Sequence, residues 1–364
     1  MAAVLGLGAP ASAQDFSAQD SREGAQYGGW SLAIDNDLFA ATENDRDYTG
    51  GIAFSVSGPQ LGNTRWSLDP LLRRIDRFAL GETADAAAPS WVDGDAPDSP
   101  RGREVVLHSA QAGIASFTPQ DITSEEIQTG DRPYASLLYV TNARQYVDPS
   151  GDRARHSAFT LGIIGLSLTS DLHDVVHEAV GSELPRGYDH QVSAGGEPTF
   201  RYVLGASRLR GQRLAFGSGL VETKTTAEMS IGYITEASYA VSTRFGAISS
   251  PWWSFNPERT DYVVQPTAVV PNRGSSELYF WAGAKLRVRA YNSLLQGQFR
   301  DSAHVFGWDE VEHVIGEAWV GLTSQLGSGT TLSYAVRYQT SELSHGLGRR
   351  EPIWAGVTIT HSFP

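Results

Sequence analysis

Cysteine is absent from this 364-residue chain, which excludes disulfide bonds and any thiolate nucleophile or metal ligand. Lysine is almost absent too, since Lys224 and Lys285 are the only two, and arginine carries nearly all of the positive charge. The formal net charge of −13 and the lack of a continuous basic face argue against a nucleic-acid partner. No apolar run approaches the roughly 18 residues that a transmembrane helix needs.

What the chain does contain is a repeated alternation of apolar and polar residues. Between positions 278 and 290 every even position is apolar, whereas the odd positions include Lys285, Arg287 and Arg289. A soluble β-sandwich also alternates, but its core would not accept charges in the middle of a strand. The pattern therefore predicts an all-β protein, a transmembrane antiparallel up-and-down β-barrel with an outward apolar face.

We expect about twelve strands, an even number as in other single-chain barrels. The odd-numbered connections of an up-and-down barrel all lie at one end, so residues 39–46, 118–132 and 167–197 should meet there. The long connections 59–102, with an amphipathic helix over 70–78, and 241–275 should lie at the other end. The expected strands cover residues 27–38, 47–58, 103–117, 133–147, 155–166, 198–209, 212–224, 226–240, 276–291, 312–325, 329–341 and 352–363.

The first connection begins with a polar cluster, Asp35-Asn36-Asp37. Carboxylate and amide oxygens at the mouth of a strand suit a hard cation such as calcium, with Asp35 and Asp37 as candidate metal ligands. Thr49 begins the return strand and should face Asp37 across the hairpin. A polar turn at the membrane boundary is the alternative explanation of this cluster.

The fifth connection carries two histidines, His173 and His177, four residues apart and therefore on one face of a helix. They are candidates for a metal pair or for a general base with a neighbouring positioning residue. Two surface histidines on a short loop helix are the alternative. Asp131 and Arg132, before the fourth strand, are best explained as a structural pair at the base of a loop.

The N-terminal region resembles a processed secretion signal, because Ala11-Ser12-Ala13 has the form of a cleavage site after a short apolar stretch. An ordinary flexible terminus is the alternative. We expect residues 1–13 to be the remnant of a signal peptide, 14–26 an N-terminal segment, and 27–364 the barrel that carries the active site.

Taken together and in order, these motifs resemble those of the outer-membrane lipid A 3′-O-deacylases, the LpxR family. The resemblance runs from about Trp30 to Phe363. It is clearest at Asn36-Asp37, Asp47-Tyr48-Thr49-Gly50, Gly130-Asp131-Arg132, and Leu161-Gly162-Ile163-Ile164-Gly165 leading into Val176-His177-Glu178-Ala179-Val180-Gly181-Ser182-Glu183.

The resemblance implies a calcium-dependent esterase that releases the 3′-linked acyloxyacyl group of lipid A in lipopolysaccharide. His177 would be the base that activates water, and Glu183 would orient that base or complete the polar site. Asn36, Asp37 and Thr49 would belong to the metal and oxyanion site. The expected place is the bacterial outer membrane, with the active site facing outward and the chain acting as a monomer.

Two positions depart from the family pattern. His173 stands where the family has a glutamine, and residues 118–132 contain no lysine, although the family has a functional lysine in that connection. Two alternatives follow from these differences. One is a non-catalytic barrel for binding or permeation, and the other is a related lipid hydrolase with a different bond or metal specificity.

Overall fold

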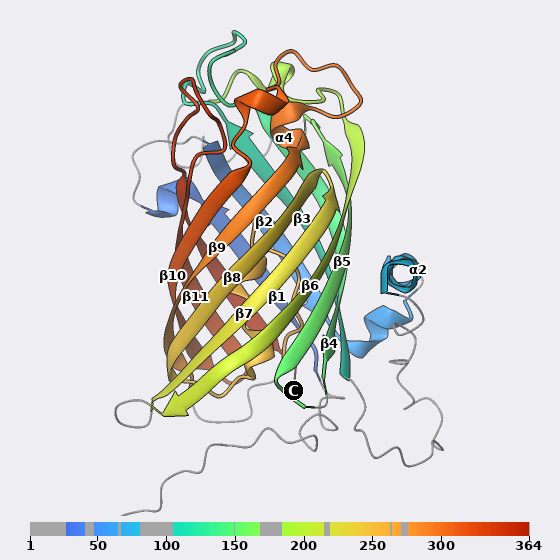
Figure 1. Cartoon of the computed structure of the whole chain (residues 1–364), viewed down its shortest axis with the longest axis vertical. Coiled ribbons are helices and arrows are strands. Elements are labelled where there is room, and N and C mark those ends of the chain that lie inside the picture. The colour runs from blue at the N-terminus through green and yellow to red at the C-terminus, as the bar shows by residue number, and fades with distance from the viewer. Residues whose placement is uncertain are drawn as a thin grey trace, which may run out of the picture.

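Twelve antiparallel strands close into a barrel in which each strand pairs with its neighbours along the chain and the first pairs with the last (Figure 1). This confirms the predicted fold class and the number of strands. The computed structural model describes residues 27–40, 47–64, 67–80, 105–148, 150–167, 184–214, 219–262, 264–270 and 276–363. The predicted signal remnant and N-terminal segment, residues 1–26, lie outside the described residues.

Most strand bounds agree with the predicted ones to within a few residues, but two predicted strands are wrong. The strands expected over 212–224 and 226–240 lie seven or eight residues further along the chain, at Leu220–Gly232 and Ile234–Ala247. The strands are β1 (Gly29–Asn36), β2 (Asp47–Ser57), β3 (Val105–Thr118), β4 (Ala135–Val147), β5 (Arg153–Ile164), β6 (Glu197–Leu214), β7 (Leu220–Gly232), β8 (Ile234–Ala247), β9 (Leu278–Asn292), β10 (Val314–Gly327), β11 (Thr330–Gln339) and β12 (Ile353–Ser362).

Short helices occur only in the connections of the described chain. They are η2 (Asp37–Ala40), η3 (Pro59–Gly62), α2 (Asp69–Leu80), η5 (Tyr188–His190), η6 (Trp252–Ser254), η7 (Pro257–Arg259), α4 (Ser293–Gln296) and η8 (Trp308–Glu310). No helix in the described ranges is long and apolar enough to span a membrane.

Strand β9 shows why the barrel wall forms. Its even-numbered side chains, from Leu278 to Ala290, are exposed on the outside, while Lys285, Arg287 and Arg289 are buried inside. Successive side chains of a strand point to opposite faces, so an alternating sequence gives an apolar outer surface and a polar lumen.

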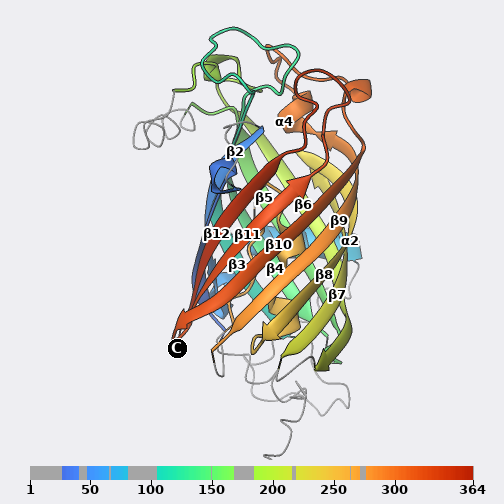
Figure 2. The same cartoon turned by 90° about the vertical axis from the view of Figure 1, so that its left-hand side faces the viewer.

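The two ends of the barrel differ. Figures 1 and 2 place the C-terminal end of the chain, and the last residues of β12, at the bottom of the barrel, which we call the terminus end. The opposite end, the loop end, carries the odd-numbered connections, including α4. The three connections expected to meet at one end begin there, as the parity of an up-and-down barrel requires.

The long connection between β8 and β9 starts at the terminus end and runs into the lumen, where residues 248–262 and 264–270 form a plug. Backbone oxygens of the plug accept hydrogen bonds from inward side chains of distant strands. Lys285 Nζ donates to Glu258 O (2.9 Å) and Thr260 O (3.1 Å), and Arg337 Nη2 donates to Pro257 O (2.7 Å). The lumen supplies these donors because every strand turns a polar face inward.

Ion pairs attach the plug to the wall. Asp261, in the plug, contacts Arg201, Lys285 Nζ at 3.0 Å and Arg287 Nη2 at 2.9 Å. Glu317 of β10 completes the network from the wall side, pairing with Arg287 and with Arg337. Buried charges are tolerated here because each has an opposite charge as a hydrogen-bonded partner.

The other long connection, between β2 and β3, contains α2, which agrees with the helix predicted over 70–78. This helix lies against the outer wall beside β4 and β5, at about mid-height of the barrel (Figure 1). Both long connections at the terminus end thus pack on the barrel, one outside and one inside.

Candidate active site

The hairpin of β1 and β2 brings together the polar residues singled out in the first connection. The two strands pair from Gly29 with Ser57 to Asn36 with Gly50. Asn36 Nδ2 donates a hydrogen bond to the carbonyl oxygen of Thr49 at 2.7 Å. The register therefore places Asn36 and Thr49 in direct contact.

A bulge in β2 determines how Thr49 is presented. The pairing of β2 with β3 shifts between Tyr48 and Gly50, which leaves Thr49 as the extra residue. Its hydroxyl lies 2.7 Å from the hydroxyl of Thr118, at the end of β3. Thr49 is 3% exposed, so this contact is held in a well-packed position.

Gly50 is required by the close approach of the two strands. A Cβ at this position would lie 2.7 Å from the carbonyl oxygen of Asp35 and 3.2 Å from Asn36 Nδ2. Any larger residue would push β2 away from β1 and separate Asn36 from Thr49.

Strand alternation divides the Asp35-Asn36-Asp37 cluster. Asp35 faces the lumen, where it lines a cavity, and its carboxylate lies against Gly356 of β12. Asn36, one residue on, is on the opposite, outer face of the same strand. The structure thus brings Asn36 together with Thr49 but directs Asp35 away from them.

Asp37 follows at the first position of η2, on the rim of the barrel, and is 3% exposed. The short helix is attached to the wall by Tyr334, whose hydroxyl donates to Phe39 O at 2.9 Å. We call Asn36, Asp37, Thr49 and Thr118 the rim cluster. Exposed apolar side chains flank it on the outer wall: Ile34, Phe39 and Ile52.

An arginine from the last connection fixes the start of β2. Arg350 Nη2 lies 2.9 Å from Asp47 Oδ1 and 2.7 Å from Asp131 Oδ1, so it joins the first, third and last odd-numbered connections. Burial alone would lower the pKa of Arg350, but the hydrogen bonds with Asp47 and Asp131 outweigh it and raise the pKa. Asp47 has a φ of 67°, a left-handed conformation that aspartate tolerates better than most residues.

Asp131 and Arg132 both stabilise the base of the loop, but they are not the ion pair that was predicted, because Asp131 pairs with Arg350 and Arg132 pairs with Glu342. Asp131 accepts hydrogen bonds from the backbone of Gln120 (2.9 Å) and Arg132 (2.7 Å), which closes the third connection. Arg132 Nη1 pairs with Glu342 at 2.7 Å and its guanidinium lies 4.5 Å from the ring centre of Phe117.

Aromatic side chains fill the lumen beneath the rim cluster. Tyr48 contacts the rings of Phe117, Tyr262 and Trp354, with ring centres 5.5, 5.2 and 5.7 Å apart. Tyr262 comes from the plug, so the plug and the wall pack together at this level. The rim cluster therefore stands on a rigid base, on the outer side of a filled barrel.

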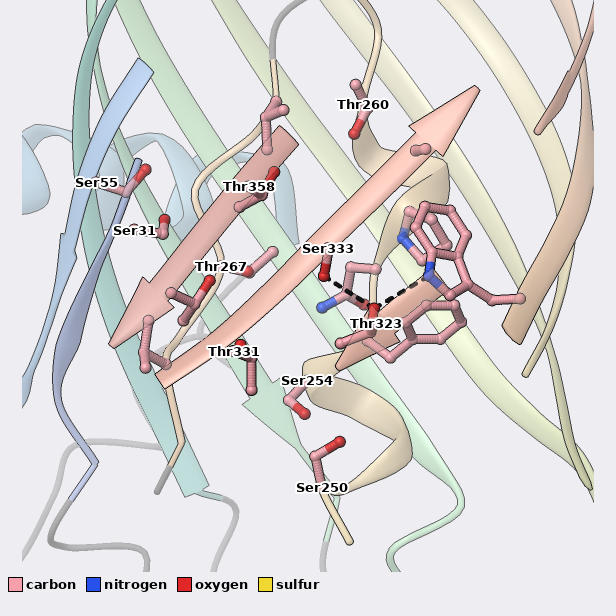
Figure 3. Close-up of a pocket in the computed structure, with 18 of the residues that line it drawn as sticks. Ser31, Ser55, Ser250, Ser254, Thr260, Thr267, Thr323, Thr331, Ser333 and Thr358 are labelled. Carbon is pink, nitrogen blue, oxygen red and sulfur yellow. Dashed lines mark hydrogen bonds between the residues drawn. The ribbon is translucent and has the colours of Figure 1, made fainter. Parts of the chain in front are cut away.

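The lumen also holds a cavity of about 220 Å³ between the plug and the wall formed by β1, β2 and β9 to β12. Figure 3 shows that hydroxyl groups dominate its wall, among them Ser31, Thr323 and Ser333. Thr323 Oγ1 lies 2.8 Å from Ser333 Oγ and accepts a hydrogen bond from Trp281 Nε1 at 3.1 Å. Its described lining includes no histidine.

His173, His177 and Glu183 lie outside the described residues, so the structure does not place them relative to the rim cluster. Residue 167 ends the described part of the fifth connection on one side and residue 184 begins it on the other. Within the described ranges, no three histidine, aspartate or glutamate residues are grouped as a metal site.

Two residues of this region were not found from the sequence. Thr118 contacts Thr49 only because of the bulge in β2, and no local pattern marks that bulge. Arg350 is 303 positions from Asp47, and its neighbours are ordinary loop residues. An arginine between Gly348 and Pro352 in a late loop could have indicated a residue that fixes the loop, but not its partners.

Comparison with known proteins relates the whole chain to one family of outer-membrane proteins. The family described as "Outer membrane protein LpxR" matches residues 1–363. Among solved structures, LpxR from Salmonella typhimurium is similar with a TM-score of 0.66 and 14% identity, covering 92% of this chain and 100% of that one. No curated protein sequence matches the chain.

The β domain of the Bordetella autotransporter BrkA is a more distant structural neighbour. Its TM-score is 0.42 at 11% identity, over 93% of this chain and 100% of the other. At that level the comparison carries no argument about this chain.

Proposed function

Because the chain belongs to the LpxR family of outer-membrane proteins, we propose that it is an esterase of the outer membrane that removes the 3′-linked acyloxyacyl group of lipid A. The observation that carries this proposal is the rim cluster. It is a polar group on the outer face of the barrel, flanked by Ile34, Phe39 and Ile52, which are exposed where acyl chains would lie. A lipid could reach it sideways from the membrane.

The proposed orientation has the loop end outside the cell and the terminus end in the periplasm. Support comes from two short turns at the terminus end, since bacterial barrels have short periplasmic turns, whereas the β2–β3 and β8–β9 connections at the same end are long. The β4–β5 and β10–β11 connections at the terminus end are short turns. Leu347 is 70% exposed at the loop end. The variant Leu347→Cys should therefore react with a membrane-impermeant maleimide on intact cells. Failure to label intact cells, with labelling after lysis, would reverse the orientation.

His177 is proposed as the general base that takes a proton from the attacking water. Glu183 would orient the imidazole, and His173, four residues before His177 in the sequence, would position the substrate. Asn36 donates from Nδ2 to Thr49 O, which fixes the orientation of its amide, and the amide oxygen is of the acceptor type that calcium binds. The hydrogen bond between Thr49 and Thr118 joins β2 to β3 and thereby fixes the carbonyl of Thr49, to which the Asn36 amide donates.

Calcium is proposed as the cofactor, on the chemistry of the donor atoms. The carboxylate of Asp37, the amide oxygen of Asn36 and nearby carbonyl oxygens are the hard ligands that calcium prefers. When bound, the ion would polarise the ester carbonyl and offset charge on the anionic lipid. We assign Asp37 to this site and not Asp35, because Asp35 faces the lumen.

The filled lumen weighs against the alternative of a permeation protein. The plug, its ion pairs and the aromatic group around Tyr48 occupy the interior along much of its length. Lipid A in lipopolysaccharide is thus the proposed partner, and no second subunit is needed to complete the rim cluster. We propose that the chain acts as a monomer.

The test is hydrolysis of lipid A by purified variants, followed by mass spectrometry. His177→Ala and Asn36→Ala should lose the release of the acyloxyacyl group while the barrel still shows heat-modifiable migration. A matched control, His190→Ala, changes an exposed histidine of η5 and should retain turnover. Full activity of His177→Ala would remove it as the base.

A further inference from the structure

Helix α2 is fastened to the outer wall by a buried ion pair. Arg144 of β4 and His108 of β3 project outward, where lipid would otherwise meet them. Arg144 Nε lies 2.7 Å from Asp69 Oδ1, and His108 Nδ1 lies 3.0 Å from the same oxygen. Burial raises the pKa of Asp69, but the hydrogen bonds from His108 and Arg144 outweigh it and hold the pKa below its ordinary value.

A second buried carboxylate of α2 makes three more contacts with the wall. Asp76 accepts hydrogen bonds from the hydroxyls of Tyr146 (3.1 Å), Ser157 (2.8 Å) and Tyr202 (2.8 Å). These side chains come from the outer faces of β4, β5 and β6. The helix therefore covers a polar area of the outer wall and is held there in one orientation.

The opposite side of α2 is basic and apolar together. Arg74 lies between Leu71 and Phe78, which are 41% and 93% exposed, and Arg77 is exposed at the edge of this side, whereas Arg73 is half-buried beside the wall-facing Asp69 and Asp76. Figure 1 views the helix nearly along its axis, so it runs across the barrel and not along it. Arginines beside exposed apolar residues on a helix parallel to the membrane plane are typical of an interfacial helix.

The adjoining strand ends continue this charge. Arg153 of β5 and Arg208 of β6 are cross-strand partners on the outer face, and both lie near the single carboxylate of Asp152, at 3.9 and 3.4 Å. Arg155 lies over the ring of Tyr146, which contacts α2. Like charges directly opposite each other in a sheet are destabilising unless an anion lies between or beside them.

We propose that these six arginines form a binding surface for anionic phospholipids of the inner leaflet, with Leu71 and Phe78 among the acyl chains. We call Arg73, Arg74, Arg77, Arg153, Arg155 and Arg208 the arginine belt. Charge complementarity selects the occupant, because the belt concentrates positive charge on a chain whose net charge is −13. A phosphate diester beside apolar chains satisfies both kinds of side chain at once. The placement in the inner leaflet rests on the proposed orientation, whereas the preference for an anionic lipid does not.

Lipid selectivity is the direct test. The detergent-solubilised barrel would be titrated with phosphatidylglycerol and with phosphatidylcholine, and bound lipid counted by native mass spectrometry. Arg74→Gln with Arg77→Gln should weaken phosphatidylglycerol binding about thirtyfold, from the usual contribution of an arginine near an anionic surface. Arg300→Gln with Arg349→Gln removes the same charge from exposed loop-end positions and should leave binding within about twofold.

The depth of α2 in the membrane provides a second test, which leaves all of the arginines unchanged. The chain has no cysteine, so Phe78→Cys gives a single site for an environment-sensitive fluorophore. In phosphatidylglycerol nanodiscs its emission should shift to the blue and be quenched by brominated acyl chains. The same label at Leu347→Cys, in the last loop, should stay unquenched.

The proposal is overturned if phosphatidylglycerol and phosphatidylcholine bind equally, or if both double variants lose binding alike. It is also overturned if free glycerol phosphate binds as tightly as the lipid, or if positions 78 and 347 report the same environment. Hydrolysis of lipid A by the wild type and the belt variants, measured in detergent, tests the esterase proposal separately from the phospholipid-binding proposal. If the wild-type barrel does not hydrolyse lipid A, the esterase proposal is refuted, whereas the proposal of selective phospholipid binding is not affected.

Discussion

Asp261 is the plug residue that pairs with three cations of the barrel wall, and Asp261→Asn tests how much these ion pairs contribute to the attachment of the plug. The substitution keeps the shape of the side chain and removes its charge. Three cations, Arg201, Lys285 and Arg287, then lose a shared partner inside the lumen. Removing one member of a buried ion pair commonly costs about 3–5 kcal/mol.

The expected cost lies near the lower end of that range, at about 3 kcal/mol. Each cation keeps a second carboxylate: Arg201 stays 3.4 Å from Glu236, and Lys285 stays 3.6 Å from Glu317, which also pairs with Arg287. These remaining contacts limit how much charge is left uncompensated. The plug should loosen without loss of the barrel.

Urea unfolding in detergent, followed by heat-modifiable migration, measures the free energy of unfolding. Single-channel recording in a planar bilayer measures whether the lumen opens. The wild type should hold no stable open state, and the variant should show transient conductance steps. Asp301→Asn, at an exposed loop position, should change stability by no more than about 0.5 kcal/mol and should not conduct. If Asp261→Asn matched this control in both assays, the plug would not depend on the ion pairs.

Three further results are expected. Asp37→Asn should raise the calcium concentration that half-saturates hydrolysis and Asp35→Asn should not, and equal responses in a calcium titration would refute the assignment. Gly50→Ala should cost about 1–3 kcal/mol in urea and lower turnover, because the new methyl group meets a backbone oxygen at 2.7 Å; an unchanged midpoint would refute the packing argument. Burial raises the pKa of Glu342, but Arg132 outweighs it and the pKa falls to about 2, so its stabilising effect, present above the ordinary value of 4.5, is lost as pH falls toward 2. Glu342→Gln should therefore flatten the loss of stability between these pH values, and a profile as steep as the wild type's would contradict this.

The barrel wall could be predicted from the sequence because side chains of a strand alternate between its two faces, and apolar and polar residues alternate with the same period of two. Strand β9 shows it fully, with apolar even positions outside and Lys285, Arg287 and Arg289 inside. Parity then placed the odd connections at one end. The same rule separates Asp35 from Asn36, a consequence of alternation that holds even though the residues are adjacent in sequence.

The plug and the partners of the rim cluster could not be predicted in that way. Residues 241–275 show no period, and their path depends on charges such as Arg201 that belong to strands far away in the chain. Thr118 meets Thr49 through a bulge, and Arg350 reaches Asp47 across the closed barrel. Helix α2 was expected from its amphipathic pattern, but its place on the outer wall follows from Asp69 and Asp76, whose partners lie on other strands.

The most direct test of the proposed function is the mass of lipid A after incubation with the purified, folded wild-type barrel, first with calcium and then with a chelator. We predict loss of the 3′ acyloxyacyl group in the presence of calcium and intact lipid A after chelation. Hydrolysis that persists in the chelator would contradict the calcium site, and an unchanged mass under both conditions would contradict the esterase itself.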